Sequence, residues 1–411
     1  MIQRPTHALT GRTQSLLEVD LANHADGLTE ALSGKSVLVI GGAGSIGSET
    51  VSLLAYYPLR HLVIVDQDEN GLARLTRRLR GHPKTLRAES ITTLPYDFGS
   101  AVFHASMNRL PAFDFVLNFA ALKHVRSEKD TLTTFQMLDT NILKPARLLD
   151  WLESHSPSAR YFSVSTDKAA NPVSFMGASK RVMEHVTFQK TNTDAFESGA
   201  TSARFANVAY SAGSLLESFV QRIETDTPLA APDGIKRFFM TLEESGEFCL
   251  LASILGEAGQ IYIPDLDPQA HLIEMRTAAE VFLSANGYSA EIYALEQQDQ
   301  AFRDFDRLKA DKKWPLILTP SDTAGEKPYE EFVGSNESLL PGPFSALNAV
   351  PYTSELSQSA LVELIEKLEY YSISSQLETL TSDDLTDWIA AIEPAFRESH
   401  IRSDRSLDDR I

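Results

Sequence analysis

Thr166, Asp167 and Lys168 are consecutive residues that offer a hydroxyl, a carboxylate and an amine. A second amine, Lys180, follows in the same segment. Neighbouring carboxyl and amino groups can work as an acid and a base, provided that the site dehydrates them enough to bring their pKa values together. The spacing therefore predicts that a hydroxyl, a carboxylate and two amines lie around one crevice, where they could transfer protons to and from a ligand.

A glycine-rich segment between residues 41 and 47 predicts a binding site for a pyrophosphate. It reads Gly-Gly-Ala-Gly-Ser-Ile-Gly and satisfies both G-x-G-x-x-G and G-x-x-G-x-x-G. Glycines allow a tight turn and a close approach of the backbone to phosphate, and the amides at the start of the following helix face the anion. A purely structural glycine turn is the alternative. The predicted contacts are Gly41, Gly44, Ser45, Ile46 and Gly47.

Acidic residues farther along the chain define the adenosine end of this site. Asp66 ends the next strand-like run, where a carboxylate accepts hydrogen bonds from the ribose hydroxyls and repels a 2′-phosphate. We therefore predict NAD rather than NADP as the cofactor. Asp97 and Phe98 follow a third strand-like region and are predicted to flank the adenine, with an ordinary loop acid as the alternative.

Short apolar runs alternate with helical patterns and would position these residues. The runs at 36–40, 61–65, 114–119 and 161–165 have the length and composition of buried strands. Continuous apolar strands separated by helices predict a parallel sheet covered on both faces, and right-handed crossovers make it doubly wound. Ligands bind at the carboxyl ends of such strands, where the glycine segment and Thr166 stand. The predicted fold class is thus α/β, a Rossmann-like doubly wound parallel sheet.

The remaining segments predict further units. Residues 1–33 are polar with scattered leucines and are assigned to an N-terminal arm, followed by an NAD-binding Rossmann domain at 34–207. Prolines interrupt the alternation beyond that point, so residues 208–345 are assigned to a smaller mixed substrate domain. Leucines recur at helical spacing in 346–411, which predicts a helical C-terminal tail, with Thr381 at a helix cap.

Composition and charge exclude several classes of protein. The chain has 411 residues, and its 56 acidic residues outnumber 37 basic ones, which argues against a nucleic-acid partner because phosphate backbones need a basic field. Cys249 is the single cysteine, so no intrachain disulfide can form, and its apolar surroundings predict a buried thiol. No run suits a signal peptide or a membrane span, so we expect a soluble cytoplasmic protein. His7, His24 and His155 show no metal-ligand spacing, so no metal is predicted.

At these motifs the chain resembles the extended short-chain dehydrogenase/reductase superfamily, and more narrowly the nucleotide-sugar 4,6-dehydratases of bacterial polysaccharide biosynthesis. The likeness is greatest to enzymes that act on activated N-acetylglucosamine, including soluble dehydratases of legionaminic-acid-type pathways, some of which take the GDP-linked sugar. It runs from about residue 36 to residue 340. The matching segments are the glycine loop and residues 120–124, 165–181, 204–208, 236–240 and 325–331.

The resemblance implies a dehydration with internal hydride transfer. NAD takes a hydride from carbon 4, water is lost across carbons 5 and 6, and the hydride returns to carbon 6, which leaves a 4-keto-6-deoxy sugar. In this scheme Asp167 protonates the leaving 6-hydroxyl and Lys168 is the carbon 5 base. Thr166 hydrogen-bonds the 4-oxygen, and Lys180 binds the nicotinamide ribose. The implied further contacts are Ala120 and Ala121 for the cofactor, and Lys123, His124, Asn207, Arg237 and Glu326 for the substrate, with structural or solvated residues as the alternative.

Two departures from the family pattern leave questions open. Met176 replaces the usual tyrosine of Tyr-x-x-x-Lys at the catalytic site, and a thioether cannot take the proton of the 4-hydroxyl. Lys180, Asp167 and a relay through Thr166 are the candidate bases for the oxidation. Residues 323–324 lack the arginine-proline that usually precedes Gly-Glu-Lys, which leaves the choice between UDP and GDP open.

Two other functions are alternatives to the dehydratase. A nucleotide-sugar 4-epimerase would also use bound NAD, but epimerisation at carbon 4 needs no acid–base pair for carbons 5 and 6, so Asp167 and Lys168 argue against it. The other alternative is a non-catalytic regulatory protein that binds NAD or a nucleotide sugar, with Met176 as the lesion. The intact Thr166 and Lys180 argue against this second alternative.

Two long helical patterns, 130–153 and 174–196, carry broad apolar faces. Such helices often form a four-helix dimer interface in the superfamily, so a homo-oligomer is predicted. The alternative is that the sheet and the C-terminal helices cover these faces. Pro145 interrupts the first pattern, and Asn141 is expected to bond the backbone groups that the proline frees.

Overall fold

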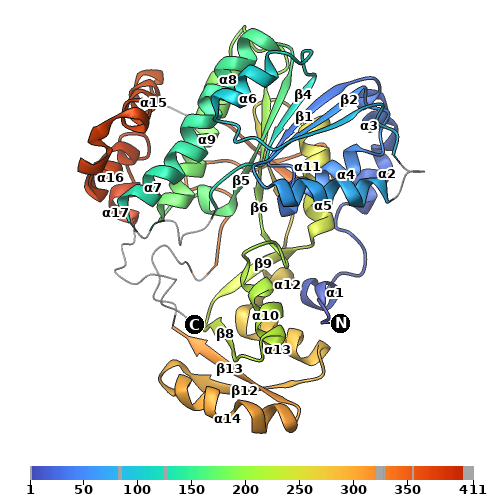
Figure 1. Ribbon diagram of the computed structural model, residues 1–411, viewed down its shortest axis with the longest axis vertical. Coiled ribbons are helices and arrows are strands. Elements are labelled where there is room, and N and C mark those ends of the chain that lie inside the picture. Colours follow the sequence, from blue (N-terminus) through green and yellow to red (C-terminus); the bar gives the residue numbers. More distant parts are fainter. Residues whose placement is uncertain are drawn as a thin grey trace.

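A nine-stranded sheet forms the centre of the molecule (Figure 1). The computed structural model describes residues 2–81, 86–123, 128, 130–320, 327, 329–353 and 356–400. The strands of the central sheet are β1 (Ser36–Ile40), β2 (His61–Val65), β3 (Ile91–Leu94), β4 (Phe115–Asn118), β5 (Arg160–Thr166), β6 (Ala200–Phe205), β10 (Gln260–Pro264), β14 (Leu340–Pro341) and β15 (Leu347–Pro351). The first two match the predicted runs, and β4 and β5 differ from them by one residue at each end.

The order of these strands is that of a doubly wound sheet. It reads β14-β15-β10-β6-β5-β4-β1-β2-β3. Neighbours from β10 to β3 pair in parallel, whereas β15 and β14 are antiparallel strands at one edge. The order reverses between β1 and β4, and a crevice for a ligand opens at the carboxyl ends of the strands at such a point. The predicted Rossmann-like α/β fold is confirmed.

Helices cover both faces of this sheet (Figure 1). One layer shares a core with the strand residues Val39, Leu62 and Phe162, and the other shares a core with Leu38, Val116 and Tyr161. Alternate residues of the same strands therefore face opposite layers, which explains why the strands read as continuous apolar runs. The first layer holds α3 (Ala25–Leu32), α4 (Ser45–Leu54), α5 (Glu69–Arg80) and α11 (Leu242–Ile254), and the second holds α6 (Ala101–Met107), α7 (Thr131–Leu138), α8 (Lys144–His155) and α9 (Phe175–Thr191).

The helical pattern at 130–153 is divided in the structure. Helix α7 passes into a π-helical segment, Asp139–Leu143, before α8 begins. Pro145 lies in the first turn of α8, where the missing amide of a proline costs no bond within that helix. Pro145 predicted an interruption of this helix, and the structure has a π-helical turn there.

A smaller unit lies below the sheet in Figure 1 and is built mainly from residues 207–319. It has two three-stranded sheets, in the orders β11-β9-β7 and β12-β13-β8 among the described residues. Strands β10 and β15 and helix α11 return to the large sheet, so residues that we assigned to the smaller domain and to the tail also build the Rossmann-like unit. The elements of the smaller unit are β7 (Asn207–Val208), α10 (Leu215–Glu224), β8 (Leu229–Pro232), β9 (Lys236–Met240), α12 (Pro268–His271), β11 (Leu272–Glu274), α13 (Met275–Ala285), β12 (Ser289–Ala294), α14 (Gln298–Ala310) and β13 (Lys313–Thr319).

The N-terminal arm is helical and fastened to the body by charged groups. It contains α1 (Thr6–Thr10) and α2 (Glu18–Asn23) before α3. Arg12 forms an ion pair with Glu244 of α11, with 2.6 Å between nitrogen and oxygen. The buried carboxylate of Asp20 accepts hydrogen bonds from the backbone amides of Ser345 and Ala346. These contacts tie the arm to segments far along the chain.

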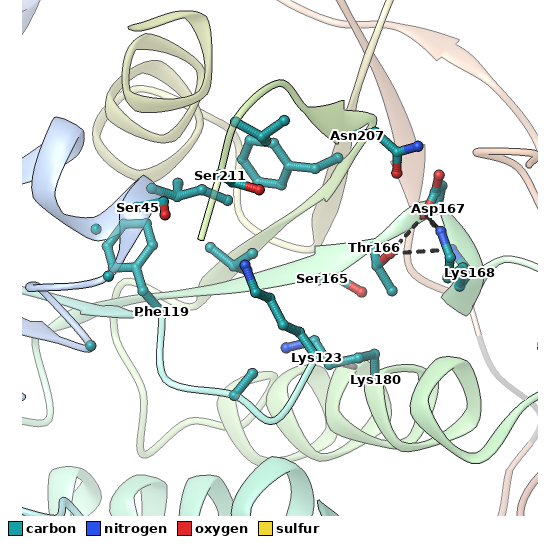
Figure 2. A pocket seen from close by; sticks show the side chains of 18 of the residues that line it. Ser45, Phe119, Lys123, Ser165, Thr166, Asp167, Lys168, Lys180, Asn207 and Ser211 are labelled. Carbon is teal, nitrogen blue, oxygen red and sulfur yellow. Dashed lines mark hydrogen bonds and ion pairs between the residues drawn. The ribbon is translucent and has the colours of Figure 1, made fainter. Parts of the chain in front are cut away.

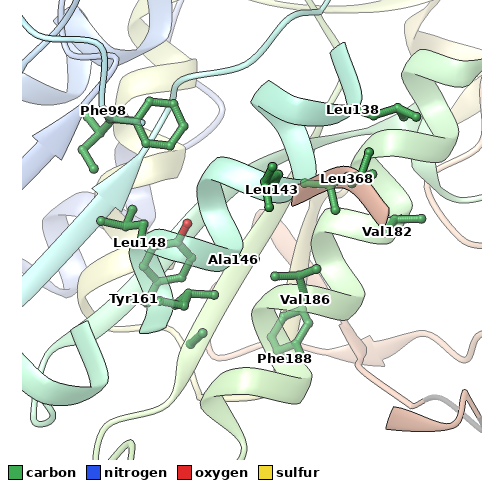
Figure 3. Close-up of a cluster of buried hydrophobic side chains, with 14 of the residues drawn as sticks. Phe98, Leu138, Leu143, Ala146, Leu148, Tyr161, Val182, Val186, Phe188 and Leu368 are labelled. Atoms are coloured by element: carbon green, nitrogen blue, oxygen red, sulfur yellow. The ribbon is translucent and has the colours of Figure 1, made fainter. Parts of the chain in front are cut away.

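The C-terminal helices cover the face that we expected at a subunit interface. They are α15 (Gln358–Ile373), α16 (Ser382–Ala390) and α17 (Phe396–Ser399), and Thr381 caps α16 as predicted. Leu368 of α15 lies near Val182 of α9 in one buried cluster (Figure 3). The chain itself thus covers part of the apolar faces of α7 and α9, and formation of a homo-oligomer stays a prediction. In the described residues, no helix is both long and apolar enough to cross a membrane.

Candidate functional site

The glycine segment joins β1 to α4 in a turn that only glycine fits. Gly41 has a φ of +73°, and a Cβ added to it would lie 2.6 Å from the backbone nitrogen of Ala120. A Cβ on Gly47 would lie 2.3 Å from the carbonyl oxygen of Gly41. Helix α4 begins at Ser45, and no side chain at its N-cap position accepts a hydrogen bond from its first amides. This geometry suits a pyrophosphate at the helix N-terminus.

A cavity of about 500 Å³ adjoins the glycine segment at the ends of β2 and β3. Asp66 accepts a hydrogen bond from the amide of Ala43 at 2.9 Å, which fixes its carboxylate against the glycine turn. Asp97 pairs with Lys144 at 2.7 Å, and although burial acts to raise the pKa of Asp97, this contact lowers it. Sequence reasoning missed Lys144. The predicted residues that line this cavity are Gly41, Gly44, Asp66, Asp97, Phe98, Ala120 and Ala121.

A second cavity, of about 370 Å³, shares Gly41, Gly44, Phe119 and Ala121 with the first. Figure 2 shows the polar side chains around it. Its lining joins the start of α4, the end of β5 and the first turns of α9, as expected for a crevice at the carboxyl edge of the sheet. The predicted residues that line it are Gly41, Gly44, Ser45, Ile46, Gly47, Ala121, Lys123, Thr166, Asp167, Lys168, Met176, Lys180 and Asn207.

Three of these side chains are linked by hydrogen bonds at the end of β5 (Figure 2). Thr166 Oγ1 donates to Asp167 Oδ1 at 2.7 Å, and Lys168 Nζ donates to the same oxygen at 3.1 Å. Lys168 Nζ also lies 3.4 Å from Glu330 Oε1. Burial acts to lower the pKa of Lys168, but the two carboxylates outweigh it and raise the pKa above the usual lysine value. Lys168 is therefore an ammonium at neutral pH.

Helix α9 supplies Met176 and Lys180. Lys180 is buried, with its Nζ 3.2 Å from the sulfur of Met183, and burial lowers its pKa to about 8 although Glu184 opposes this effect. The backbone amide of Met176 donates to Glu128 at 2.8 Å. Burial raises the pKa of Glu128 to about 7. Sequence reasoning missed Glu128, which lies in a charged segment that carried no motif.

Asn141 and Lys123 shape the wall between β4 and α9. Asn141 donates to the carbonyl of Leu122 and to the hydroxyl of Ser179, and it accepts from the amide of Leu122. We expected it to bond backbone groups freed by Pro145, but its bonds instead tie the loop after β4 to α9. Lys123 lines the cavity next to this loop.

One predicted substrate contact, Arg237, lies apart from the cavity lining. Arg237 is buried, donates to the carbonyl of Lys327 at 2.9 Å and lies 3.9 Å from Glu330. His124 and Glu326 lie outside the described residues. Cys249 is fully buried, as predicted. Among the described residues, no group of histidine, cysteine and carboxylate side chains could hold a metal ion.

The profile of one protein family, described as polysaccharide biosynthesis protein, matches residues 37–347. The chain belongs to the polysaccharide biosynthesis protein family. The match covers most of the chain and includes both cavities, so the site belongs to the part that the family shares.

Relatives of this polysaccharide biosynthesis protein carry several names. The capsular polysaccharide biosynthesis protein CapD of Staphylococcus aureus is 26% identical over 325 residues, which are 78% of this chain and 48% of CapD. The chain thus spans about half the length of that relative. The UDP-glucose 4-epimerase of Rickettsia felis is 26% identical over 346 residues, 82% of this chain and 96% of the epimerase. The structure of MoeE5 in complex with UDP-glucose and NAD has a similar fold, with a TM-score of 0.53 and 17% identity over 82% of this chain and 100% of MoeE5.

Proposed function

We propose that the chain is an NAD-dependent nucleotide-sugar 4,6-dehydratase that acts on UDP- or GDP-N-acetylglucosamine. The observation that carries the proposal is the contact between Asp167 and Lys168 beside Thr166. These residues line the cavity of about 370 Å³, which shares Gly41 and Gly44 with the cavity next to Asp66. An acid and a base held 3.1 Å apart suit the loss of water across two adjacent carbons. The family name fits an enzyme that prepares sugars for a polysaccharide.

The residues of the chain fit NAD in three places. The glycine turn brings the backbone close enough for a pyrophosphate, and α4 presents its N-terminal amides to it. Asp66 is held as an acceptor for the adenosine ribose. NAD, when bound, would accept the hydride from carbon 4 and, once reduced, would donate it to carbon 6. The complex of MoeE5 with NAD supports this choice of cofactor.

Thr166 and Asp167 provide a path for the proton of the 4-hydroxyl. The hydroxyl of Thr166 donates to the carboxylate at 2.7 Å, so a proton that Thr166 receives from the 4-oxygen can pass to Asp167. Asp167 then holds the proton that the leaving 6-hydroxyl requires, and water departs with it. Asp167 gains one proton during oxidation and loses it during elimination. This path therefore does the work of the tyrosine base that superfamily members usually have at the position of Met176.

Lys168 in its amine form takes the proton of carbon 5, which the ketone at carbon 4 acidifies. It returns this proton to carbon 5 once the hydride reaches carbon 6, so the net change is the loss of one water. Because the pKa of Lys168 is raised, the amine is a minor form at neutral pH. The rate of the proton transfer therefore rises with pH up to that pKa.

The other predicted residues have supporting roles in this proposal. Lys180 binds the nicotinamide ribose, and its buried position in the first half of α9 supports this role. Lys123 and Asn207 contact the nucleotide sugar from the cavity wall. Arg237 does not line the cavity, and its positive charge lies near Glu330 and acts to lower the pKa of Lys168.

Incubation of the purified protein with UDP- and with GDP-N-acetylglucosamine, followed by mass spectrometry, tests the proposal. The dehydratase lowers the mass of one of them by one water. A 4-epimerase, which the Rickettsia felis relative supports as a second candidate, leaves the mass unchanged but alters chromatographic mobility. An unchanged sugar with NAD still bound would instead fit a regulatory binding protein.

A further inference from the structure

Glu330 is a buried carboxylate next to the proposed base. Its relative exposure is 4%, and its Oε1 lies 3.4 Å from Lys168 Nζ. Among the described residues, this oxygen accepts no hydrogen bond. Glu330 is not part of the cavity lining, so it reaches the reaction only through Lys168. A buried carboxylate oxygen without a hydrogen bond costs free energy, so its presence here calls for a physical reason.

Asp167, Arg237 and Lys327 are charged groups close to the ion pair between Lys168 and Glu330. Asp167 and Glu330 both contact Lys168 Nζ, at 3.1 and 3.4 Å. Arg237 lies 3.9 Å from Glu330 and acts to lower the pKa of Lys168. Lys327 adds a positive charge near Glu330, and its Nζ donates to the carbonyl of Asn171. Two negative charges, on Asp167 and Glu330, thus stabilise the ammonium of Lys168, and the positive charge of Arg237 opposes them.

We propose that Glu330 is a positioning residue that holds Lys168 against Asp167 and stabilises the ammonium that forms when Lys168 takes the proton of carbon 5. The contact that carries this inference is the ion pair between two side chains that are both largely shielded from water. The catalytic part rests on the proposed function, whereas the effect on the charge of Lys168 does not.

Glu330→Gln tests this role because it removes the charge and keeps the shape of the side chain. Glu331→Gln is the matched control, since Glu331 is the next residue, is exposed, and bonds Asn171 instead of the lysine. Lysines labelled with ¹³C at Cε report their own titration by NMR in the enzyme purified with its cofactor. The signal of Lys168 is the one missing from Lys168→Met.

Glu330→Gln is expected to lower the pKa of Lys168 by about one to three units, as loss of an opposite charge at this distance does. Glu331→Gln leaves it unchanged, and Glu330→Asp, which keeps a carboxylate, retains a raised value. An unchanged titration in Glu330→Gln overturns the proposal. If that variant does not fold, the wild type decides: a pKa of Lys168 below the usual lysine value of 10.5 contradicts it.

A pH profile of solvent exchange at carbon 5 separates this role from a merely structural one. Glu330→Gln is expected to move the acidic limb to lower pH, because less alkali is then needed to form the amine. A structural role would lower the rate equally at every pH and leave the limb in place, which would contradict the proposal. If no nucleotide sugar reacts with the wild type, the proposed function fails, while the NMR titration still decides the role of Glu330.

Discussion

Lys168→Met removes the proposed base and keeps an unbranched side chain that is one atom shorter. Because the path through Thr166 to Asp167 is left in place, oxidation at carbon 4 is expected to proceed. Elimination then stops, and the rate of dehydration falls by about 10²–10⁴-fold, the usual cost of losing a positioned general base. Up to one reduced nicotinamide accumulates on each enzyme molecule. Asp167→Asn, in contrast, blocks both steps and accumulates none.

The same change also affects stability, because Asp167 and Glu330 are 5% and 4% exposed and both contact the ammonium. Loss of one partner from a buried ion pair costs about 3–5 kcal/mol, and the neighbouring Arg237 offsets part of this loss. The double variant Lys168→Met/Glu330→Gln removes one of the two carboxylate charges that lose the ammonium, and leaves Asp167 charged. It is therefore expected to recover part of the stability without recovering any dehydration.

Three measurements on Lys168→Met judge this reasoning. Near-ultraviolet absorbance follows reduced nicotinamide after substrate is added, mass spectrometry follows the loss of water, and urea denaturation gives the free energy of unfolding. Product formed at more than about a hundredth of the wild-type rate would refute Lys168 as the base. A double variant no more stable than Lys168→Met would refute the described charge contact with Glu330.

Three further predictions follow from the same geometry. Asp66→Ser is expected to weaken NAD binding and to raise the affinity for NADP relative to NAD about tenfold or more, which calorimetry on the stripped protein checks. Exchange at carbon 5 is expected to rise about tenfold per pH unit below the pKa of Lys168, since only the amine accepts a proton; a flat profile from pH 7 to 9 would contradict this. Glu184→Gln, which leaves the fully buried Arg204 short of a partner, is expected to cost about 3–5 kcal/mol in urea denaturation, while Arg397→Gln, at an exposed pair, costs about 1 kcal/mol or less.

The sequence predicted those parts of the site that depend on local order. Strand β1, the glycine turn and the start of α4 are contiguous, and their residues could be read from one short segment. Asp66 and Thr166 could be placed because each ends a buried parallel strand, and such ends meet at one edge of the sheet. The same rule brought Lys123 to the cavity wall.

Contacts between distant segments could not be predicted in this way. Glu330 follows Lys168 by more than a third of the chain, and no periodic pattern indicates that the two side chains meet. Strands β10 and β15 join the large sheet after a long excursion, so the alternation of strands and helices gave no sign of them. The bonds of Asn141 were assigned to its own helix because a single sequence shows only local partners, whereas the structure gives Leu122 and Ser179.

Transfer of deuterium within the sugar tests the central claim most directly. The purified protein is given UDP- or GDP-N-acetylglucosamine that carries deuterium on carbon 4, and the product is examined by NMR and mass spectrometry. The account predicts a 4-keto-6-deoxy sugar, one water lighter, with the deuterium on carbon 6. Deuterium retained on carbon 4 of a sugar with unchanged mass would contradict the dehydratase, and inversion of the configuration at that carbon would indicate an epimerase.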